Sequence, residues 1–293
     1  MKVLVLGKNG QVACSLRQRL PDAQYLGRAE LDLEQVEQIR PRIMEARPDF
    51  IVNAAAFTAV DLAEDEVERA WQVNAHAVRE VAEGACALGV PVLHLSTDYV
   101  FSGKGERPYL ESDPVEPVNQ YGASKLAGEQ ALAESAGESY WILRTSWVFS
   151  EFGGNFVKTM LKLAQTRDHL SVVHDQRGRP SYAGDLADVI CLIIARHRAG
   201  DSLPAGLYHC ASAGVVSWYE FAAAVFEDAV ARGLVAAQPM LTPIPSQDYP
   251  TRAERPMNSV LDTRRLEQAL SWQPPDWRRG LRAMLDERTK GDG

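Results

Sequence analysis

Two residues four positions apart carry the clearest chemistry in this sequence, Tyr121 and Lys125. On a helix, side chains at positions i and i+4 project from one face, so a phenol and an ammonium group would lie together. A tyrosine has an ordinary pKa near ~10, and a neighbouring ammonium group lowers it by favouring the phenolate. The spacing therefore predicts a tunable proton donor, although the same pattern also occurs on surface helices. Thr97, which ends an apolar run, would add a hydroxyl group beside the pair.

A turn with glycines at positions 7 and 10 could bind a pyrophosphate group. It follows an apolar run and opens a helix, so side chains would not block the backbone and the free N–H groups of the helix would face the anion. Ala13 stands where a third glycine is usual and is still small enough for close packing. We interpret Gly7 and Gly10 as cofactor-binding residues; a plain structural turn is the alternative.

The next charged residues indicate which dinucleotide would bind. Arg28 follows the expected second strand and Asp32 lies slightly further along the chain. An acidic residue at the strand end favours the free ribose hydroxyls of NAD, whereas an arginine can pair with the 2′-phosphate of NADP. Arg28 is nearer the strand end, so we expect NADPH, with NADH as an alternative. A solvated surface charge is the other interpretation of Arg28.

Small residues at 53–58, including Ala55, suggest a backbone that lies against an adenine or a ribose, although tight core packing would look similar. Asn74 is either a surface residue or an anchor for backbone and water near the reaction centre.

These residues need a scaffold that brings strand ends together, and the first half of the chain alternates short β-branched runs with helical periodicity. The predicted strands are residues 2–6, 50–53, 90–96 and 140–144, and the predicted helices are residues 11–20, 67–88 and 121–136. We predict an α/β fold, a Rossmann-like doubly wound parallel sheet.

A second region is expected after about residue 147. Residues 1–147 would form the NAD(P)-binding domain and residues 148–293 a smaller substrate-binding region, interleaved with late elements of the sheet. Its predicted helices are residues 155–167, 184–198 and 217–232. The proline-broken and arginine-containing stretch 242–258 is expected to be a binding loop at the carboxyl edge of the sheet.

The composition of the chain limits the classes of partner and the cellular location that we expect. The chain has 293 residues, a formal charge of -8 and no apolar span of membrane length, so we expect a cytoplasmic protein without nucleic-acid or membrane partners. The four cysteines and six histidines show no metal-ligand spacing, so we expect no metal site, mostly buried free thiols, and structural or surface roles for the histidines.

The order of these motifs carries a resemblance to a known family. The chain resembles the extended short-chain dehydrogenases, whose catalytic Ser/Thr, Tyr and Lys match Thr97, Tyr121 and Lys125. Within that group it is most similar to the dTDP-4-dehydrorhamnose reductases, through GKNGQVA, RPDFIVNAAAFTAVDLAE, LSTDYVFSGKG, YGASKLAGE, RTSWVFS, NFVKTMLKLA, VVHDQRGRPS, GLYHCA and RPMNSVLDT.

The resemblance implies reduction of a dTDP-linked 4-keto-6-deoxysugar to dTDP-L-rhamnose for bacterial polysaccharide. Carried over by position, it places Gly10, Gln11, Val12, Asp32, Leu33, Ala56, Phe57 and Thr58 at the dinucleotide, with Tyr121 and Lys125. It places Thr97, Asp98, Trp147, Asn155, Gln176, Arg255 and Asn258 at the sugar nucleotide. We expect Tyr121 to donate the proton, Lys125 to hold the nicotinamide ribose and Thr97 to bind the carbonyl oxygen.

Three points stay open at the level of sequence. Some family members form Mg²⁺-bridged dimers through glutamates, one of them in the first helix; residues 14–16 are Cys-Ser-Leu here, which argues against that bridge and leaves a monomer or a homodimer. A nucleotide-sugar 4,6-dehydratase or 4-epimerase shares the Thr, Tyr and Lys, but a dehydratase needs an acid and a base directly after the Thr. A non-catalytic regulatory subunit of the same fold could also keep the Tyr and Lys.

Overall fold

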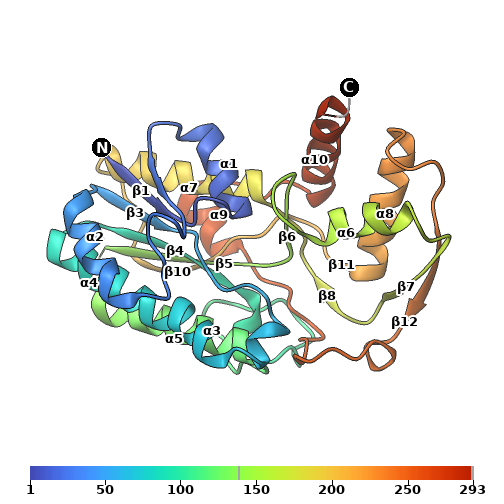
Figure 1. Ribbon diagram of the computed structural model, residues 1–293, viewed down its shortest axis with the longest axis horizontal. Helices are drawn as coiled ribbons and strands as arrows, with labels where there is room; N and C mark the ends of the chain where they lie inside the picture. Colours follow the sequence, from blue (N-terminus) through green and yellow to red (C-terminus); the bar gives the residue numbers. More distant parts are fainter. Residues whose placement is uncertain (138, 292–293) are drawn as a thin grey trace.

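The centre of the protein is a sheet of six parallel strands, which confirms the predicted fold class (Figure 1). The computed structural model describes residues 1–137 and 139–291. The strand order is β10-β5-β4-β3-β1-β2. The strands are β1 (Val3–Leu6), β2 (Gln24–Leu26), β3 (Phe50–Asn53), β4 (Val92–Thr97), β5 (Tyr140–Thr145) and β10 (Gly206–His209). Their carboxyl ends therefore meet at one edge, where ligands of such sheets bind.

Helices cover both faces of this sheet. One face is covered by α1 (Gln11–Arg19), α7 (Ala183–Arg198) and α9 (Arg264–Leu270). The other face is covered by α2 (Ile39–Ala46), α4 (Ala77–Leu88) and α5 (Gln120–Ser135). Because both faces are buried, most strand residues are apolar and nearly continuous along each strand, as expected for a parallel sheet.

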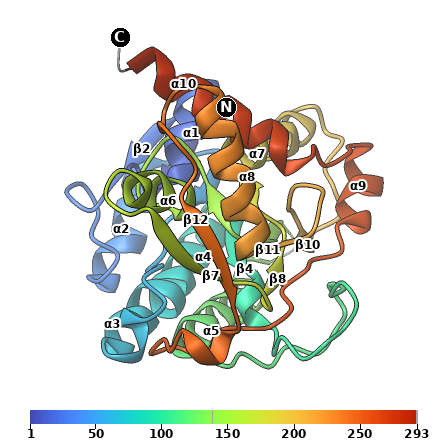
Figure 2. The same ribbon diagram turned by 90° about the vertical axis from the view of Figure 1, so that its right-hand side faces the viewer.

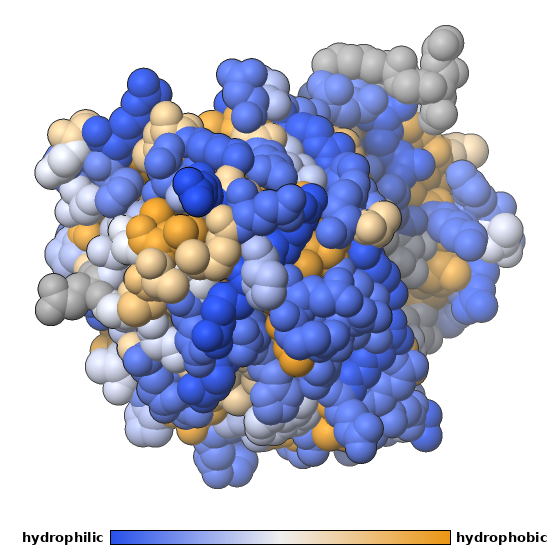
Figure 3. Space-filling view, turned by 60° about the vertical axis from the view of Figure 1, so that its left-hand side comes forward, coloured by the Kyte–Doolittle hydropathy of each residue, from blue (hydrophilic) through white to orange (hydrophobic). Residues whose placement is uncertain are grey.

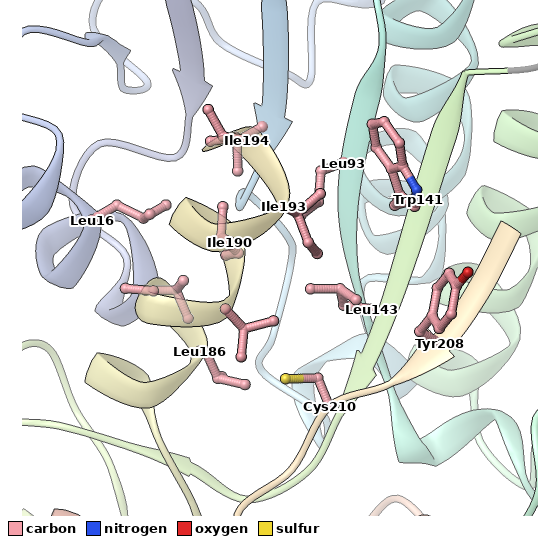
Figure 4. Packing of buried hydrophobic residues seen from close by; sticks show 14 of the residues in the cluster. Leu16, Leu93, Trp141, Leu143, Leu186, Ile190, Ile193, Ile194, Tyr208 and Cys210 are labelled. Carbon is pink, nitrogen blue, oxygen red and sulfur yellow. The ribbon is translucent and has the colours of Figure 1, made fainter. Parts of the chain in front are cut away.

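The packing of α7 shows why the two halves of the chain form one core. Its residues Leu186, Ile190 and Ile193 lie between Leu16 of α1 and the sheet (Figure 4). Trp141 of β5 packs on the same face. A helix from beyond residue 147 thus completes the core of the predicted cofactor-binding region.

The rest of the C-terminal half builds a second core beyond one end of the sheet (Figures 1 and 2). Its helices are α6 (Phe156–Ala164), α8 (Trp218–Ala231) and α10 (Trp277–Gly291), and its longer strands, β7 (His169–Val173) and β12 (Met240–Ile244), pair in parallel. Two short pairs join it to the sheet region: β6 (Val148–Phe149) with β9 (Ser181–Tyr182), and β8 (Arg177–Gly178) with β11 (Val216–Ser217).

The predicted helix 67–88 is confirmed as a continuous helical stretch, which consists of α3 (Val67–Trp71), the π-helix η3 (Gln72–His76) and α4. Two other expectations need correction. The predicted loop 242–258 begins inside β12, where Pro243 is tolerated because the strand pairs with β7 alone in a two-stranded sheet. The cysteines are free, but Cys210 is the buried one; Cys14 and Cys191 are half-buried and Cys86 is exposed.

Short 3-10 turns complete the chain, namely η1 (Val36–Gln38), η2 (Leu62–Glu64), η4 (Asp98–Val100) and η5 (Ser246–Asp248). Within the described residues, no helix is both long enough and apolar enough to cross a membrane. The face shown in Figure 3 is mostly hydrophilic, with apolar side chains in small groups.

Candidate active site

The turn between β1 and α1 has the backbone geometry that an anion needs. Gly7 has a φ of +103°, and a Cβ atom there would lie 2.8 Å from the backbone nitrogen of Ala55. Only glycine fits this position. Gly10 is the N-cap of α1 and no side chain caps the helix, so the first N–H groups of α1 are free for a ligand.

This turn lines a cavity of about 480 Å³ along the carboxyl edge of the sheet. Of the residues predicted at the cofactor, Gly7, Gly10, Gln11, Val12, Arg28, Asp32, Leu33, Ala55, Ala56, Thr58, Tyr121 and Lys125 line it. The cavity therefore runs from the glycine turn to the predicted proton donor. A wall of glycine and alanine backbone next to a free helix N-terminus fits a dinucleotide.

Phe57, also predicted at the cofactor, lies just outside this lining. It is buried beside Val73 and Tyr121, and the Arg69 guanidinium lies 5.5 Å from the centre of its ring. Its backbone is held by Asn74: the Phe57 N–H donates to Asn74 Oδ1 over 2.9 Å, and Asn74 Nδ2 donates to the Phe57 carbonyl over 3.1 Å. Phe57 thus supports the cavity wall.

Asn74 links that wall to α5, the helix that carries Tyr121 and Lys125. It lies fully buried in η3, and its Nδ2 also donates to Ser124 Oγ over 3.0 Å. Ser124 Oγ in turn donates to the carbonyl of Tyr121 over 2.8 Å. Of the two interpretations of Asn74, the structure supports the backbone anchor, and π-helical turns of this kind often occur at functional sites.

Arg28, which was predicted near the adenosine half of the dinucleotide, is exposed and already paired. Its guanidinium lies 2.9 Å from Glu34 and 3.9 Å from Asp32. Lys8 also lines the cavity and pairs with Glu30. The sequence did not single out Lys8 as a cofactor-binding residue. Two cations, Lys8 and Arg28, therefore line the cavity, each paired with carboxylates that a phosphate group would have to displace.

Beside Tyr121, which lines the cavity, Thr97 and Asp98 add a buried hydroxyl group and a buried carboxyl group. Thr97 Oγ1 donates to Asp98 Oδ1 over 3.1 Å and contacts the Tyr121 hydroxyl. Burial raises the pKa of Asp98 to about 7, although hydrogen bonds from Ser259 and Thr97 act against it. Asp98 is thus a carboxyl group that changes its protonation state near neutral pH.

The structure corrects one expectation about Tyr121. Burial raises its pKa above the ordinary value, and the opposing effect comes from the Thr97 hydroxyl. The expected lowering by Lys125 is absent, because the Lys125 ammonium is turned toward β4. It donates to the Leu95 carbonyl over 2.7 Å and lies 3.1 Å from His94 Nε2. Tyr121 is therefore a neutral phenol with its proton in place.

Lys125 is buried over a layer of polar residues, His94, Ser96, Glu129 and Arg144, that was not predicted from the sequence. Burial lowers its pKa to about 8, and the charge of Glu129 acts in the opposite direction. Glu129 accepts from Arg144 over 2.9 and 2.6 Å and from Ser96. An alternation of polar residues, at 94 and 96 in one strand, was the signal that could have indicated this layer.

The residues predicted at the sugar nucleotide fall into two groups. Trp147 stacks on Trp218 at 3.5 Å between ring centroids, and Trp218 Nε1 donates to Gln176 Oε1. Arg255 pairs with Asp61 at 2.6 Å and stands over the ring of Tyr99, next to Tyr121. One group is thus an aromatic platform, and the other is an arginine that contacts Asp61 and Tyr99 from the first half of the chain.

Asn155 and Asn258 bind the protein itself. Asn155 caps α6, and its Nδ2 donates to Gln11 Oε1 over 3.0 Å. Asn258 Nδ2 donates to the carbonyls of Gly105 and Arg107. Both residues hold loops in place, Asn155 next to the glycine turn.

The arrangement can donate a proton from Tyr121, which lines the cavity, to a carbonyl oxygen placed beside the Thr97 and Tyr121 hydroxyl groups. Within residues 1–137 and 139–291, no group of three or more His, Cys, Asp or Glu side chains is placed to hold a metal ion.

Comparisons with known proteins agree with this chemistry. The family model described as the RmlD substrate binding domain matches residues 1–290. The dTDP-4-dehydrorhamnose reductase of Aggregatibacter actinomycetemcomitans is 43% identical over 286 residues, covering 96% of this chain and 97% of that protein. The reductase of the same name from Escherichia coli K12 is 43% identical, covering 98% of each. The crystal structure of dTDP-4-dehydrorhamnose reductase from Bacillus anthracis in complex with NADP has a TM-score of 0.89 and 35% identity, and covers 98% of this chain and 100% of that one.

Proposed function

The chain belongs to the RmlD substrate-binding family, and we propose that it is a dTDP-4-dehydrorhamnose reductase. It is an oxidoreductase that takes NAD(P)H as its cofactor. The observation that supports the proposal is that one cavity is lined both by the glycine turn and by Tyr121 and Lys125, with the Thr97 hydroxyl in contact with Tyr121. Its substrate is a dTDP-linked 4-keto-6-deoxysugar and its product is dTDP-L-rhamnose, a precursor of bacterial polysaccharide.

The cofactor, when bound, supplies the hydride that reduces the ketone at C4 of the sugar. The remaining steps belong to the chain. Thr97 hydrogen-bonds the carbonyl oxygen and fixes its place, and Tyr121 donates the phenolic proton to that oxygen as negative charge develops on it. Lys125 binds the nicotinamide ribose through its ammonium group. Burial of all three side chains excludes water from the reacting atoms.

The sugar nucleotide is proposed to bind against Thr97, Asp98 and Trp147, with Gln176 and Arg255 on the substrate side. Asn155 and Asn258, which the resemblance also places there, are proposed to act by holding the surrounding loops. Asp98 and Trp147 come from the ends of β4 and β5, so both follow strands at the same edge of the sheet. The division into residues 1–147 for the cofactor and residues 148–293 for the substrate is part of this proposal. So are a cytoplasmic location and a monomeric or homodimeric state.

NADPH is the proposed preference. Arg28 and Lys8 stand at the adenosine end of the cavity, where a 2′-phosphate would lie. Asp32 and Glu34 lie beside Arg28, so NADH is accepted as the weaker cofactor. The Bacillus anthracis structure with NADP supports this preference.

The test follows NADPH oxidation by its absorbance, with a dTDP-4-keto-6-deoxysugar as substrate and with NADH in a parallel reaction. We expect stoichiometric oxidation of NADPH and formation of dTDP-L-rhamnose. An epimerase would convert the sugar without net oxidation of the cofactor. Absence of oxidation with both cofactors would refute the reductase proposal.

A further inference from the structure

His94 is a fully buried histidine in the layer beneath the active site. It belongs to β4, on the sheet face that packs against α5, and its Nε2 lies 3.1 Å from Lys125 Nζ. It does not line the cavity, whereas Lys125 does. His94 therefore acts on the cavity only through Lys125.

Counting donors fixes what each atom in this contact does. An ammonium group has three N–H donors and no acceptor, so His94 Nε2 must accept and the imidazole proton must be on Nδ1. The Leu95 carbonyl accepts a second donor of Lys125 over 2.7 Å. Two of the three donors of Lys125 are thus held by β4, which leaves the third for the cavity.

This arrangement reduces the stability of the fold at the other ring nitrogen of His94. Nδ1 of His94 is buried and has no hydrogen-bond partner among the described residues. An unpaired buried N–H group destabilises the fold, and an apolar side chain would fill the same space without that penalty. The imidazole must therefore contribute something other than packing.

We propose that His94 is a positioning residue whose neutral imidazole accepts a hydrogen bond from Lys125 and so aims the remaining ammonium N–H at the nicotinamide ribose. The inference rests on the proposed function. It adds a residue beneath the Thr, Tyr and Lys to the machinery that fixes the cofactor.

The surroundings keep His94 uncharged. Burial and the charge of Lys125 both lower its pKa well below the ordinary value. The other charged or titratable groups around Lys125 are Tyr121 and Glu129 from α5, Asp98 from η4 and Arg144 from β5, which is paired with Glu129. A neutral acceptor favours the ammonium form of Lys125 without adding a second negative charge beside Glu129.

The experiment compares three variants. His94→Leu removes the acceptor and keeps an apolar side chain of similar size, and His94→Gln restores an acceptor near the position of Nε2. His209→Leu is the matched control, because His209 is equally buried in β10 but bonds to the Asp262 carbonyl. Thermal unfolding of each variant reports the cost to the fold.

We expect His94→Leu to lower kcat/KM for NADPH by about tenfold to a hundredfold, as for the loss of a hydrogen bond to a charged group. The alkaline limb of its pH profile should move to lower pH, because the ammonium form of Lys125 is less stable. His94→Gln should recover most of the activity and the original limb. His209→Leu should leave the limb in place.

Two readouts do not need turnover. NADPH binding, followed by the fluorescence of the nicotinamide, should weaken in His94→Leu and recover in His94→Gln. Nitrogen NMR of the wild-type protein should show His94 as the neutral Nδ1–H tautomer. Equal losses in the Leu and Gln variants, an unmoved alkaline limb in His94→Leu, or an Nε2–H tautomer would overturn the inference. If the wild type reduces no keto sugar, the proposed function fails, while NADPH binding still tests His94.

Discussion

Tyr121 is held between two opposing influences on its proton. Burial favours the neutral phenol and raises its pKa, while the Thr97 hydroxyl favours the phenolate. Burial is the larger effect, so the residue carries its proton before the reaction and needs a reason to release it. The developing alkoxide of the substrate provides that reason, because an alkoxide is a stronger base than a phenolate.

If Tyr121 donates the proton, removal of its hydroxyl oxygen should slow the reaction. Tyr121→Phe should lower kcat by about 10²–10⁴-fold, while KM and the melting temperature change little. Tyr208→Phe is the control, since Tyr208 is also buried but donates to the Pro204 carbonyl, away from the cavity. Steady-state kinetics with NADPH and the keto sugar measure both variants. Near wild-type turnover by Tyr121→Phe would exclude Tyr121 as the proton donor.

Asp98 should make stability depend on pH in an unusual direction. Its pKa is raised from 3.8 to about 7 in the folded protein, so the folded state keeps a proton that the unfolded chain releases. The stability from this group is complete below about pH 4 and is lost as the pH rises through its folded pKa.

Asp98→Asn removes this dependence. The free energy of unfolding of the wild type, relative to Asp98→Asn, should fall by on the order of 4 kcal/mol between about pH 4 and pH 7. Asp113→Asn is the contrast, because hydrogen bonds from Arg107 lower the pKa of Asp113. The stability from Asp113 is present above about pH 4 and is lost only as the pH falls below that value. Urea unfolding on both sides of about pH 4 measures both differences. Parallel curves for the wild type and Asp98→Asn would contradict the raised pKa.

At the scale of elements, the sequence predicted what depends on local pattern. The strands at 50–53 and 140–144 and the helix at 121–136 were placed to within about two residues, because buried parallel strands are apolar runs and helices repeat at 3.6 residues. The π-helix η3 was missed, since one extra residue in a turn leaves the periodicity almost unchanged. The π-helix is explained by tertiary contacts, because it brings Asn74 within hydrogen-bond distance of Phe57 and Ser124.

In the candidate site, too, features set by local spacing were predicted and features set by tertiary contacts were missed. The glycine turn and the Tyr121–Lys125 pair were visible because their spacing is local. The polar layer of His94, Ser96, Glu129 and Arg144 was not, because it depends on which faces of β4, β5 and α5 meet. Pairings across elements leave little trace in a single sequence.

The contact between η3 and α5 predicts a reversal of helix propensity. Alanine normally stabilises a helix interior by about 1 kcal/mol relative to glycine. At Gly128 in α5, however, a Cβ atom would lie 2.0 Å from the carbonyl oxygen of Asn74. Gly128→Ala should therefore destabilise the protein by about 1–3 kcal/mol, as overpacked cores do. Chemical unfolding measures the change, and a gain in stability would show that η3 and α5 do not meet as closely as described.

At the scale of the whole molecule, the two halves of the sequence are not two separate folding units. The strand β10 lies at one edge of the sheet beside β5, and α7 covers the same face as α1. Gln11 in the glycine turn bonds to Ser150 and Asn155 over 2.9 and 3.0 Å. The cofactor cavity is therefore completed by residues that follow the predicted boundary at residue 147, among them Val148, Gly153 and Gly154.

This interleaving predicts how fragments behave. A fragment of residues 1–147 would expose the face of the sheet that α7 and α9 cover and the edge of β5 that β10 covers, so it should fail to fold and should not bind NADPH. A fragment of residues 1–212 keeps α7 and β10 and should recover much of the sheet, while the full chain should unfold in one transition. Far-UV circular dichroism and NADPH fluorescence compare the three. A fragment 1–147 that unfolds cooperatively and binds NADPH would show that the cofactor-binding half needs nothing from the second half of the chain.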